Sequence, residues 1–127
     1  MTVLLDTHYL IRPLSADRRL SGRALEIVSD PEQAVMVSIV SLWEIAIKSS
    51  LGKLDVDGGV EGVMAKLPDM GFGVIGLSNE HVATVAHLPL HHRDPFDRML
   101  IAQAKHEGMH LLTVDPHFGA YDVPLIK

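Results

Sequence analysis

Four acidic residues of this 127-residue sequence could together bind a divalent cation: Asp6, Glu44, Asp97 and Asp115. The chain has no cysteine, and a site built from carboxylate oxygens favours Mg²⁺ or Mn²⁺ over zinc or copper. Mg²⁺ typically takes one or two carboxylates, keeps several waters and also binds substrate phosphates. The natural chemistry of such a site is hydrolysis of a phosphodiester bond by a metal-activated water.

The four acids fall where the chain leaves a predicted strand or enters a predicted helix. Asp6 and Asp115 each follow directly on an apolar run, whereas Glu44 and Asp97 lie in what we expect to be first helical turns. The carboxyl ends of parallel strands meet at one edge of a sheet, where ligands bind. We therefore expect all four carboxylates near that edge. With no equally clear row of basic partners, a cation would relieve their repulsion.

Short apolar runs alternate along the chain with helical patterns. We expect strands at residues 3–5, 35–37, 73–77, 111–114 and 123–126, the last at a sheet edge. We expect helices at residues 21–29, 41–50, 57–66, 78–87 and 94–108, counting their caps. Continuously apolar strands that alternate with helices indicate a parallel sheet covered on both faces. We predict a single domain, residues 1–127, with a three-layer α/β/α sandwich around a mainly parallel sheet of four to five strands.

Glu44 and Asp97 could instead have only a structural role, in capping the helices that carry them. Ser41 followed by Glu44 fits a capping box, as does Asp94 followed by Asp97. Asp94, with a proline directly behind it, is most simply an N-cap. The acids that follow the strands could simply form turns. Four such accidents at one sheet edge are improbable together, so we predict a metal site with Asp94 as a supporting residue.

Other polar residues near these acids are predicted to support the site. Thr7 and Ser41, and likewise Thr113 and Ser38, could contact a metal-bound water or simply hold the local structure. Arg98 could bind phosphate or form a surface salt bridge. The eight histidines show no spacing typical of metal ligands, and we expect His92 to be solvated. Trp43 is expected in the core.

Composition limits the classes of protein further. The formal net charge is −5, which argues against a nonspecific DNA-coating protein, although a bound metal can reverse the local charge. The absence of cysteine excludes disulfides and thiolate metal sites. The N-terminal stretch has no basic segment ahead of its apolar run, and no stretch reaches the ~18 apolar residues of a membrane span. We expect a soluble, cytoplasmic protein.

Four motifs, in this order, resemble those of the PIN-domain ribonucleases, and most closely the toxin subunits of VapBC-type type II toxin–antitoxin modules: LLDTH, SLWEIAIKSSLGKL, HHRDPFDRMLIAQA and LLTVD. The resemblance implies a PIN-like α/β/α sandwich and a Mg²⁺- or Mn²⁺-dependent site that cleaves RNA. It also implies a small antitoxin that blocks this site, and a homodimer. The acids of the family fall on Asp6, Glu44, Asp97 and Asp115.

The sequence departs from this pattern after the first motif. Similar chains usually continue with an apolar helical run, whereas this one carries Arg12 and Pro13. We expect Pro13 to shorten or kink the first helix. Arg12 brings a charge to a position expected to be buried. The four acids are unaffected by this difference.

Two other classes of function remain open. A metal-dependent phosphatase or phosphotransfer domain also places aspartates at strand ends. A phosphotransfer receiver needs an adjacent acidic pair after the first strand, and a haloacid-dehalogenase-type phosphatase needs DxD. The residues around Asp6, LDTH, supply neither. A non-catalytic protein-binding domain would use the acids only as caps.

Overall fold

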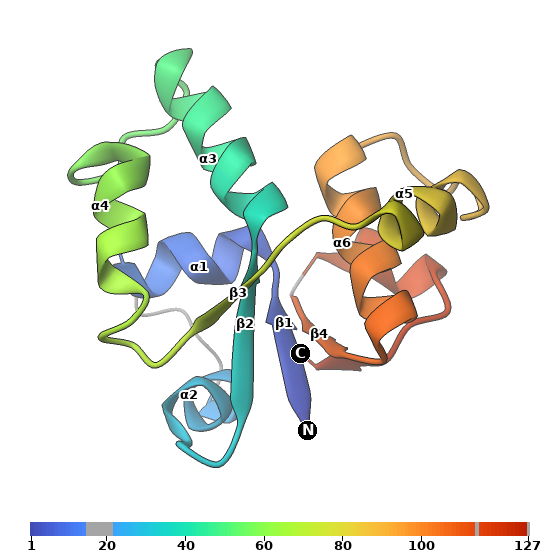
Figure 1. The fold of residues 1–127 in the computed structure, drawn as a ribbon, viewed down its shortest axis with the longest axis horizontal. Helices are drawn as coiled ribbons and strands as arrows, with labels where there is room; N and C mark the ends of the chain where they lie inside the picture. Colours follow the sequence, from blue (N-terminus) through green and yellow to red (C-terminus); the bar gives the residue numbers. More distant parts are fainter. Residues whose placement is uncertain (15–21, 114, 127) are drawn as a thin grey trace.

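The computed structural model describes residues 1–14, 22–113 and 115–126, and a parallel sheet of five strands forms its centre (Figure 1). The strands are β1 (Thr2–Leu5), β2 (Ala34–Ser38), β3 (Gly73–Ile75), β4 (His110–Leu112) and β5 (Leu125–Ile126). Their order is β3-β2-β1-β4-β5, and every neighbouring pair is parallel. The predicted parallel sheet of four to five strands is thus confirmed.

Helices cover both faces of this sheet, as predicted. They are α1 (Thr7–Leu14), α2 (Gly22–Ser29), α3 (Ile39–Ser50), α4 (Gly59–Lys66), α5 (Asn79–Ala86) and α6 (Pro95–Glu107), with a short 3₁₀ helix η1 (Pro116–Ala120). Figure 1 shows α1, α2 and α4 on one side of β1 and β2, and α5 and α6 on the other. No helix in the described ranges is long and apolar enough to cross a membrane.

Both faces of β1 are buried, because successive side chains of a strand point to opposite faces. Val3 and Leu5 pack into one core with residues of the helices on their side, including Tyr9, Leu10, Ile45 and Val63. Leu4 packs into a second core on the other face, with Leu100, Ile101, Leu111 and Phe118. Burial on both faces explains why the strand reads as a continuous apolar run.

The direction in which successive strands are added to the sheet changes beside β1. The chain runs from β1 to β2 and β3 on one side, and then returns to β4 and β5 on the other. In open parallel sheets ligands bind in the crevice outside the strand ends at such a point. The register pairs Leu5 with Leu112, and the backbone N–H of Asp6 donates to the carbonyl of Leu112 at 3.0 Å. The next residues along both strands, Asp6 and Thr113, are therefore neighbours at this crevice.

The start of α3 differs from the prediction. Its N-cap is Ser38, whose Oγ accepts a hydrogen bond from the backbone N–H of Val40 at 3.0 Å. The predicted capping box of Ser41 and Glu44 is therefore wrong, and Glu44 lies in the second turn of the helix. The serine that ends β2 also caps α3, so no loop separates the two elements.

The start of α6 agrees with the prediction. Asp94 Oδ1 accepts hydrogen bonds from the backbone N–H groups of Phe96 at 2.9 Å and Asp97 at 3.2 Å. Pro95 occupies the first helical position, and Gly108 ends the helix with φ 69°. The cap fixes the direction in which the first turn of α6, including Asp97, enters the molecule.

The remaining differences concern the ends of strands and helices, and some predicted ends fall on residues that the structure does not describe. β3 and β5 are shorter than expected, and η1 was not predicted. The expected cap Ser21 and the strand end Val114 lie outside the described residues. The α1 helix continues through Pro13 to Leu14, while the surroundings of the Arg12 and Pro13 side chains lie outside the described part.

A buried polar network joins α6 to the carboxyl ends of β2 and β3. Ser38 Oγ donates to Gln103 Oε1 at 2.6 Å, and Gln103 Nε2 donates to the carbonyl of Gly76 at 3.2 Å. Both Gln103 and Ser38 are fully buried. An unpaired buried polar group costs more than the bond itself contributes, so this network holds α6 at the strand ends.

We predict that Gln103→Leu lowers the free energy of unfolding by about 1–3 kcal/mol, because the Gly76 carbonyl and the Ser38 hydroxyl lose their partner. Urea denaturation at neutral pH measures the change. Gln33→Leu is the matched control, since the Gln33 Oε1 atom is buried without a hydrogen-bond partner among the described residues. An unchanged urea midpoint in Gln103→Leu would contradict the role of the network.

Candidate metal site

Asp6 is fixed at the carboxyl end of β1 by its neighbour across the sheet. Only 1% of its surface is exposed, and Asp6 Oδ2 accepts a hydrogen bond from Thr113 Oγ1 at 2.8 Å. The same Thr113 oxygen accepts from the backbone N–H of Asp115 at 3.0 Å. The Asp6 carbonyl accepts from the N–H of Tyr9 at 3.0 Å, so α1 begins directly behind it. One threonine thus joins the acids that follow β1 and β4.

Glu44 approaches the same crevice from α3. Thr7 Oγ1 donates to Ser41 Oγ at 2.8 Å, and this buried contact joins the first residue of α1 to α3. Glu44 lies three residues after Ser41 and therefore on the same helix face. It is 4% exposed. Thr7 and Ser41 accordingly position the helix that carries Glu44.

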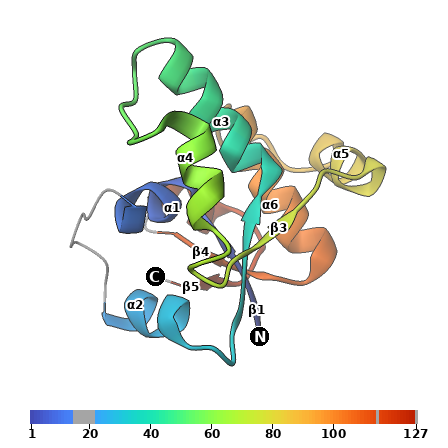
Figure 2. The ribbon, with the colours of Figure 1, turned by 60° about the vertical axis from the view of Figure 1, so that its left-hand side comes forward.

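Asp97 enters from α6 and is 8% exposed. Its burial, and then repulsion by four other carboxylates, raise its pKa from 3.8 to about 8; those carboxylates belong to Asp94, Asp6, Glu44 and Asp115. Repulsion of this kind requires the groups to lie close together. Asp6, Glu44 and Asp115, and the supporting Asp94, therefore all lie within electrostatic range of Asp97. In Figures 1 and 2 the two helices that carry Glu44 and Asp97, α3 and α6, lie close together above β1 and β2.

Two basic side chains on the α1 side contact these acids. Lys48 Nζ donates to Glu44 Oε2 at 2.6 Å, and the hydrogen bond to Glu44 raises the pKa of the lysine. His8 Nδ1 lies 3.4 Å from Asp6 Oδ2. That hydrogen bond is the main cause of the raised pKa of His8, which partial burial opposes. The expectation that the acids have no clear basic partners is therefore wrong.

Two stacked histidines contact the acids on the other side. His92 Nε2 lies 3.5 Å from Asp97 Oδ2, and His117 Nδ1 lies 2.9 Å from Asp115 Oδ1. The two rings are parallel, with centroids 5.5 Å apart. Burial, and then the charge of His117, lower the pKa of His92. The prediction that His92 is solvated is wrong, because folding brings the loop before α6 against η1.

The acids fit a hard divalent cation by their chemistry. Asp6 Oδ1 and Glu44 Oε1 are buried and have no hydrogen-bond partner among the described residues. Across those same residues, no three His, Asp or Glu side chains stand close enough to hold an ion with their present rotamers. In this arrangement Lys48 contacts Glu44, and His8, whose pKa is raised, contacts Asp6. To bind an ion, the carboxylates would have to leave these partners and contact the metal instead.

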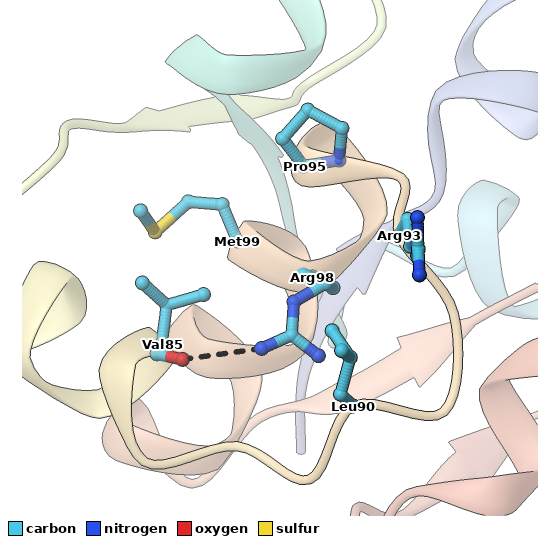
Figure 3. Close-up of a pocket in the computed structure, with 6 residues that line it drawn as sticks. All are labelled: Val85, Leu90, Arg93, Pro95, Arg98 and Met99. Atoms are coloured by element: carbon cyan, nitrogen blue, oxygen red, sulfur yellow. Dashed lines mark hydrogen bonds between the residues drawn. The ribbon is translucent and has the colours of Figure 1, made fainter.

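Arg98 has a different environment from the one expected for a phosphate ligand. Its Nη1 donates to the Pro89 carbonyl at 2.7 Å and to the Tyr121 hydroxyl at 3.1 Å, and its Nη2 donates to the carbonyls of Val85 and Leu88 at 3.4 Å. Figure 3 shows this guanidinium in a pocket of about 400 Å³ that none of the four acids lines. Arg98 thus ties the end of α5 to α6.

Sequence reasoning missed several residues of this site. Lys48 could have been found, because it lies four residues after Glu44 on one helix. Thr113 was expected near the site, but its contact with Asp6 and the His92–His117 stack could not be predicted, since these side chains meet the acids only through the fold. Trp43 was placed in the core but is 60% exposed, with its ring packed edge-on to Phe96 at a centroid distance of 5.3 Å.

The structure is thus a parallel α/β domain with acidic residues near the point where the direction of the strand order changes. Residues 3–124 match the PIN domain family, and the chain belongs to that family. Comparison with curated protein sequences gives no match.

Solved structures share the fold at low sequence identity. A chain of VapBC2 from Rickettsia felis, bound to a DNA fragment from their promoter, has a TM-score of 0.74 and 17% identity over 99% of this chain and 98% of that one. A toxin–antitoxin complex from Klebsiella pneumoniae gives 0.65 and 21%, over 98% and 96%. VapBC-1 from nontypeable Haemophilus influenzae gives 0.64 and 16%, over 100% and 98%. These likenesses establish a shared architecture.

We predict that Asp97→Asn flattens the pH dependence of stability in metal-free protein. Because the pKa of Asp97 is about 8 when folded and ordinarily 3.8, the unfolded chain releases this proton first as the pH rises. The contribution of Asp97 to stability is therefore present at low pH and is lost between about pH 4 and pH 8. At pH 8 the asparagine variant should be more stable than the wild type by about 1–3 kcal/mol.

Urea unfolding at pH 5 and pH 8 in EDTA measures this difference. The control is Asp69→Asn, which changes an exposed carboxylate and should keep the pH dependence of the wild type. If the stability–pH curves of the wild type and the Asp97→Asn variant are parallel, the pKa of Asp97 is not raised in the folded protein.

Proposed function

We propose that the protein is a Mg²⁺- or Mn²⁺-dependent endoribonuclease that acts as the toxin of a toxin–antitoxin pair. The observation that carries this proposal is that Asp6, Glu44 and Asp115 lie close enough to Asp97 to raise its pKa, while Asp6 Oδ1 and Glu44 Oε1 are buried with no hydrogen-bond partner among the described residues. Membership of the PIN domain family supports nuclease chemistry. The shared fold with chains of toxin–antitoxin complexes supports the toxin role.

The four acids would hold the ion directly or through water. When bound, the ion would supply an activated water and would stabilise charge on the leaving oxygen of the phosphodiester. Thr113 holds the Asp6 carboxylate in place through its hydroxyl. Thr7 and Ser41 hold α1 and α3 together, and so keep Asp6 and Glu44 at a fixed spacing.

Asp94 serves this site through the backbone. Its carboxylate accepts from the first N–H groups of α6, so that helix end is already satisfied. Its negative charge adds to the repulsion that favours a cation beside Asp97. Asp94 is thus proposed as a supporting residue and not as a ligand.

The toxin role implies two further partners. One is a small antitoxin whose binding blocks the acidic crevice. The other is a second copy of this chain in a homodimer. The substrate of the free toxin is RNA, which presents the phosphodiester that the acids would act on.

Asp6→Asn should reduce RNA cleavage by at least about 100-fold, since loss of outer-sphere partners of a metal alone costs 10–100-fold. Cleavage of labelled single-stranded and hairpin RNAs in Mg²⁺ or Mn²⁺ measures the rate, and circular dichroism checks the fold. Asp69→Asn should cleave like the wild type. Full activity of Asp6→Asn in metal-replete buffer would refute the scheme. Phosphate release from a small phosphomonoester, with RNA left intact, would instead favour a phosphatase.

Addition of Mn²⁺ or Mg²⁺ should raise the melting temperature of the wild type until the site saturates. An ion present at 100 times its dissociation constant stabilises the native state by about 2.7 kcal/mol. Differential scanning fluorimetry with an EDTA reversal measures the shift, and Glu44→Gln should diminish it. If neither ion changes the melting temperature of the wild type, a non-catalytic binding domain is the better description.

A further inference from the structure

A cavity of about 170 Å³ adjoins the acidic crevice between α1 and α3. Glu44 lines it together with Lys48, Lys53, Thr7, His8 and apolar side chains. Its volume equals that of roughly five or six waters at about 30 Å³ each, which is room for a phosphate group. The cavity therefore connects a buried acid of the proposed active site with two ammonium groups.

The backbone brings the two lysines to the same cavity. Lys48 lies one turn after Glu44 on α3. Beyond the end of the helix, Gly52 adopts φ 71°, a left-handed conformation that glycine takes without strain. The turn lets the N–H of Lys53 donate to the carbonyl of Lys48 at 2.9 Å, so the chain folds back beside the helix end. Two basic side chains five residues apart thus line one pocket.

Charge and donor capacity indicate what this cavity binds. The chain has a formal net charge of −5, and the neighbouring carboxylates repel a polyanion. The Lys48 ammonium group has three N–H donors and uses one of them in its hydrogen bond to Glu44, so two remain for a ligand. Lys53 adds a second positive charge, and the Thr7 hydroxyl lies on the same wall. Among the described residues no Phe, Tyr or Trp side chain lines the cavity, and the His8 ring there contacts Asp6, so the two ammonium groups suit a phosphate better than a stacked base.

We propose that Lys48 and Lys53 form a subsite for a backbone phosphate of the RNA strand, next to the phosphodiester that is cleaved. The inference rests on the proposed nuclease function and adds to it a substrate contact. The subsite holds the strand by its phosphate and not by its base. It therefore contributes affinity that is independent of RNA sequence and sensitive to salt.

The test measures binding separately from cleavage. In an Asp6→Asn background, a fluorescently labelled single-stranded RNA is titrated at several KCl concentrations and its anisotropy is recorded. Lys48→Met with Lys53→Met should raise the dissociation constant about 10-fold near physiological salt. The slope of log affinity against log salt should fall by about 0.7 for each lysine that neutralises a phosphate. Oligonucleotides of different base sequence, and single-stranded DNA, should lose the same factor.

Two control variants separate charge from structure. Lys48→Arg with Lys53→Arg keeps both charges and should retain the salt slope. Lys66→Met with Lys105→Met removes two exposed lysines that do not line the cavity, and should leave binding unchanged. Melting temperatures of all variants show whether any loss reflects unfolding.

The outcomes distinguish this inference from the proposed function. If the Asp6→Asn protein binds RNA and the double methionine variant binds it equally tightly with the same salt slope, the subsite is overturned and the nuclease proposal stands. If the double variant loses affinity for a glutamate-rich peptide but not for RNA, the cavity is a protein-docking site and the inference is overturned. If the Asp6→Asn protein keeps its fold by circular dichroism but binds no RNA at any salt concentration, both proposals fail.

Discussion

Repulsion among carboxylates at the carboxyl ends of the strands is the physical constraint on which the other contacts around these residues depend. Parallel pairing of β1 with β4 sets Asp6 beside Thr113, and the helices add Glu44 and Asp97 to the same crevice. Buried like charges are costly, and the protein offsets them in several ways. Asp97 keeps a proton to about pH 8, Lys48 contacts Glu44, and histidines contact the other acids. A divalent cation would replace all of these at once.

The fold holds the acids together through buried polar contacts as well as through its apolar cores. Gln103 joins α6 to the ends of β2 and β3, and Thr7 joins α1 to α3. Asp94 fixes the start of α6. The same helix, α3, carries Glu44 toward the acids and Lys48 toward the adjoining cavity.

The chain belongs to the PIN domain family and shares its architecture with chains of solved structures at 16–21% sequence identity. The burial of apolar runs on both sheet faces can be met by many residue combinations. Fewer residue combinations can bring several carboxylates together, because such a site needs strand ends and helix starts at fixed positions.

Local rules were enough for the parallel sheet, most helix positions and the Asp94 cap, because apolar runs and capping chemistry depend on neighbours in the chain. They also marked all four acids. They misplaced the start of α3, since Ser38 and Ser41 are both good caps and only the end of β2 decides between them. Contacts between distant segments needed the tertiary structure: Thr113 on Asp6, the His92–His117 stack, and the Gln103 network. Folding brings together residues up to 107 positions apart, and no local pattern records which of them meet.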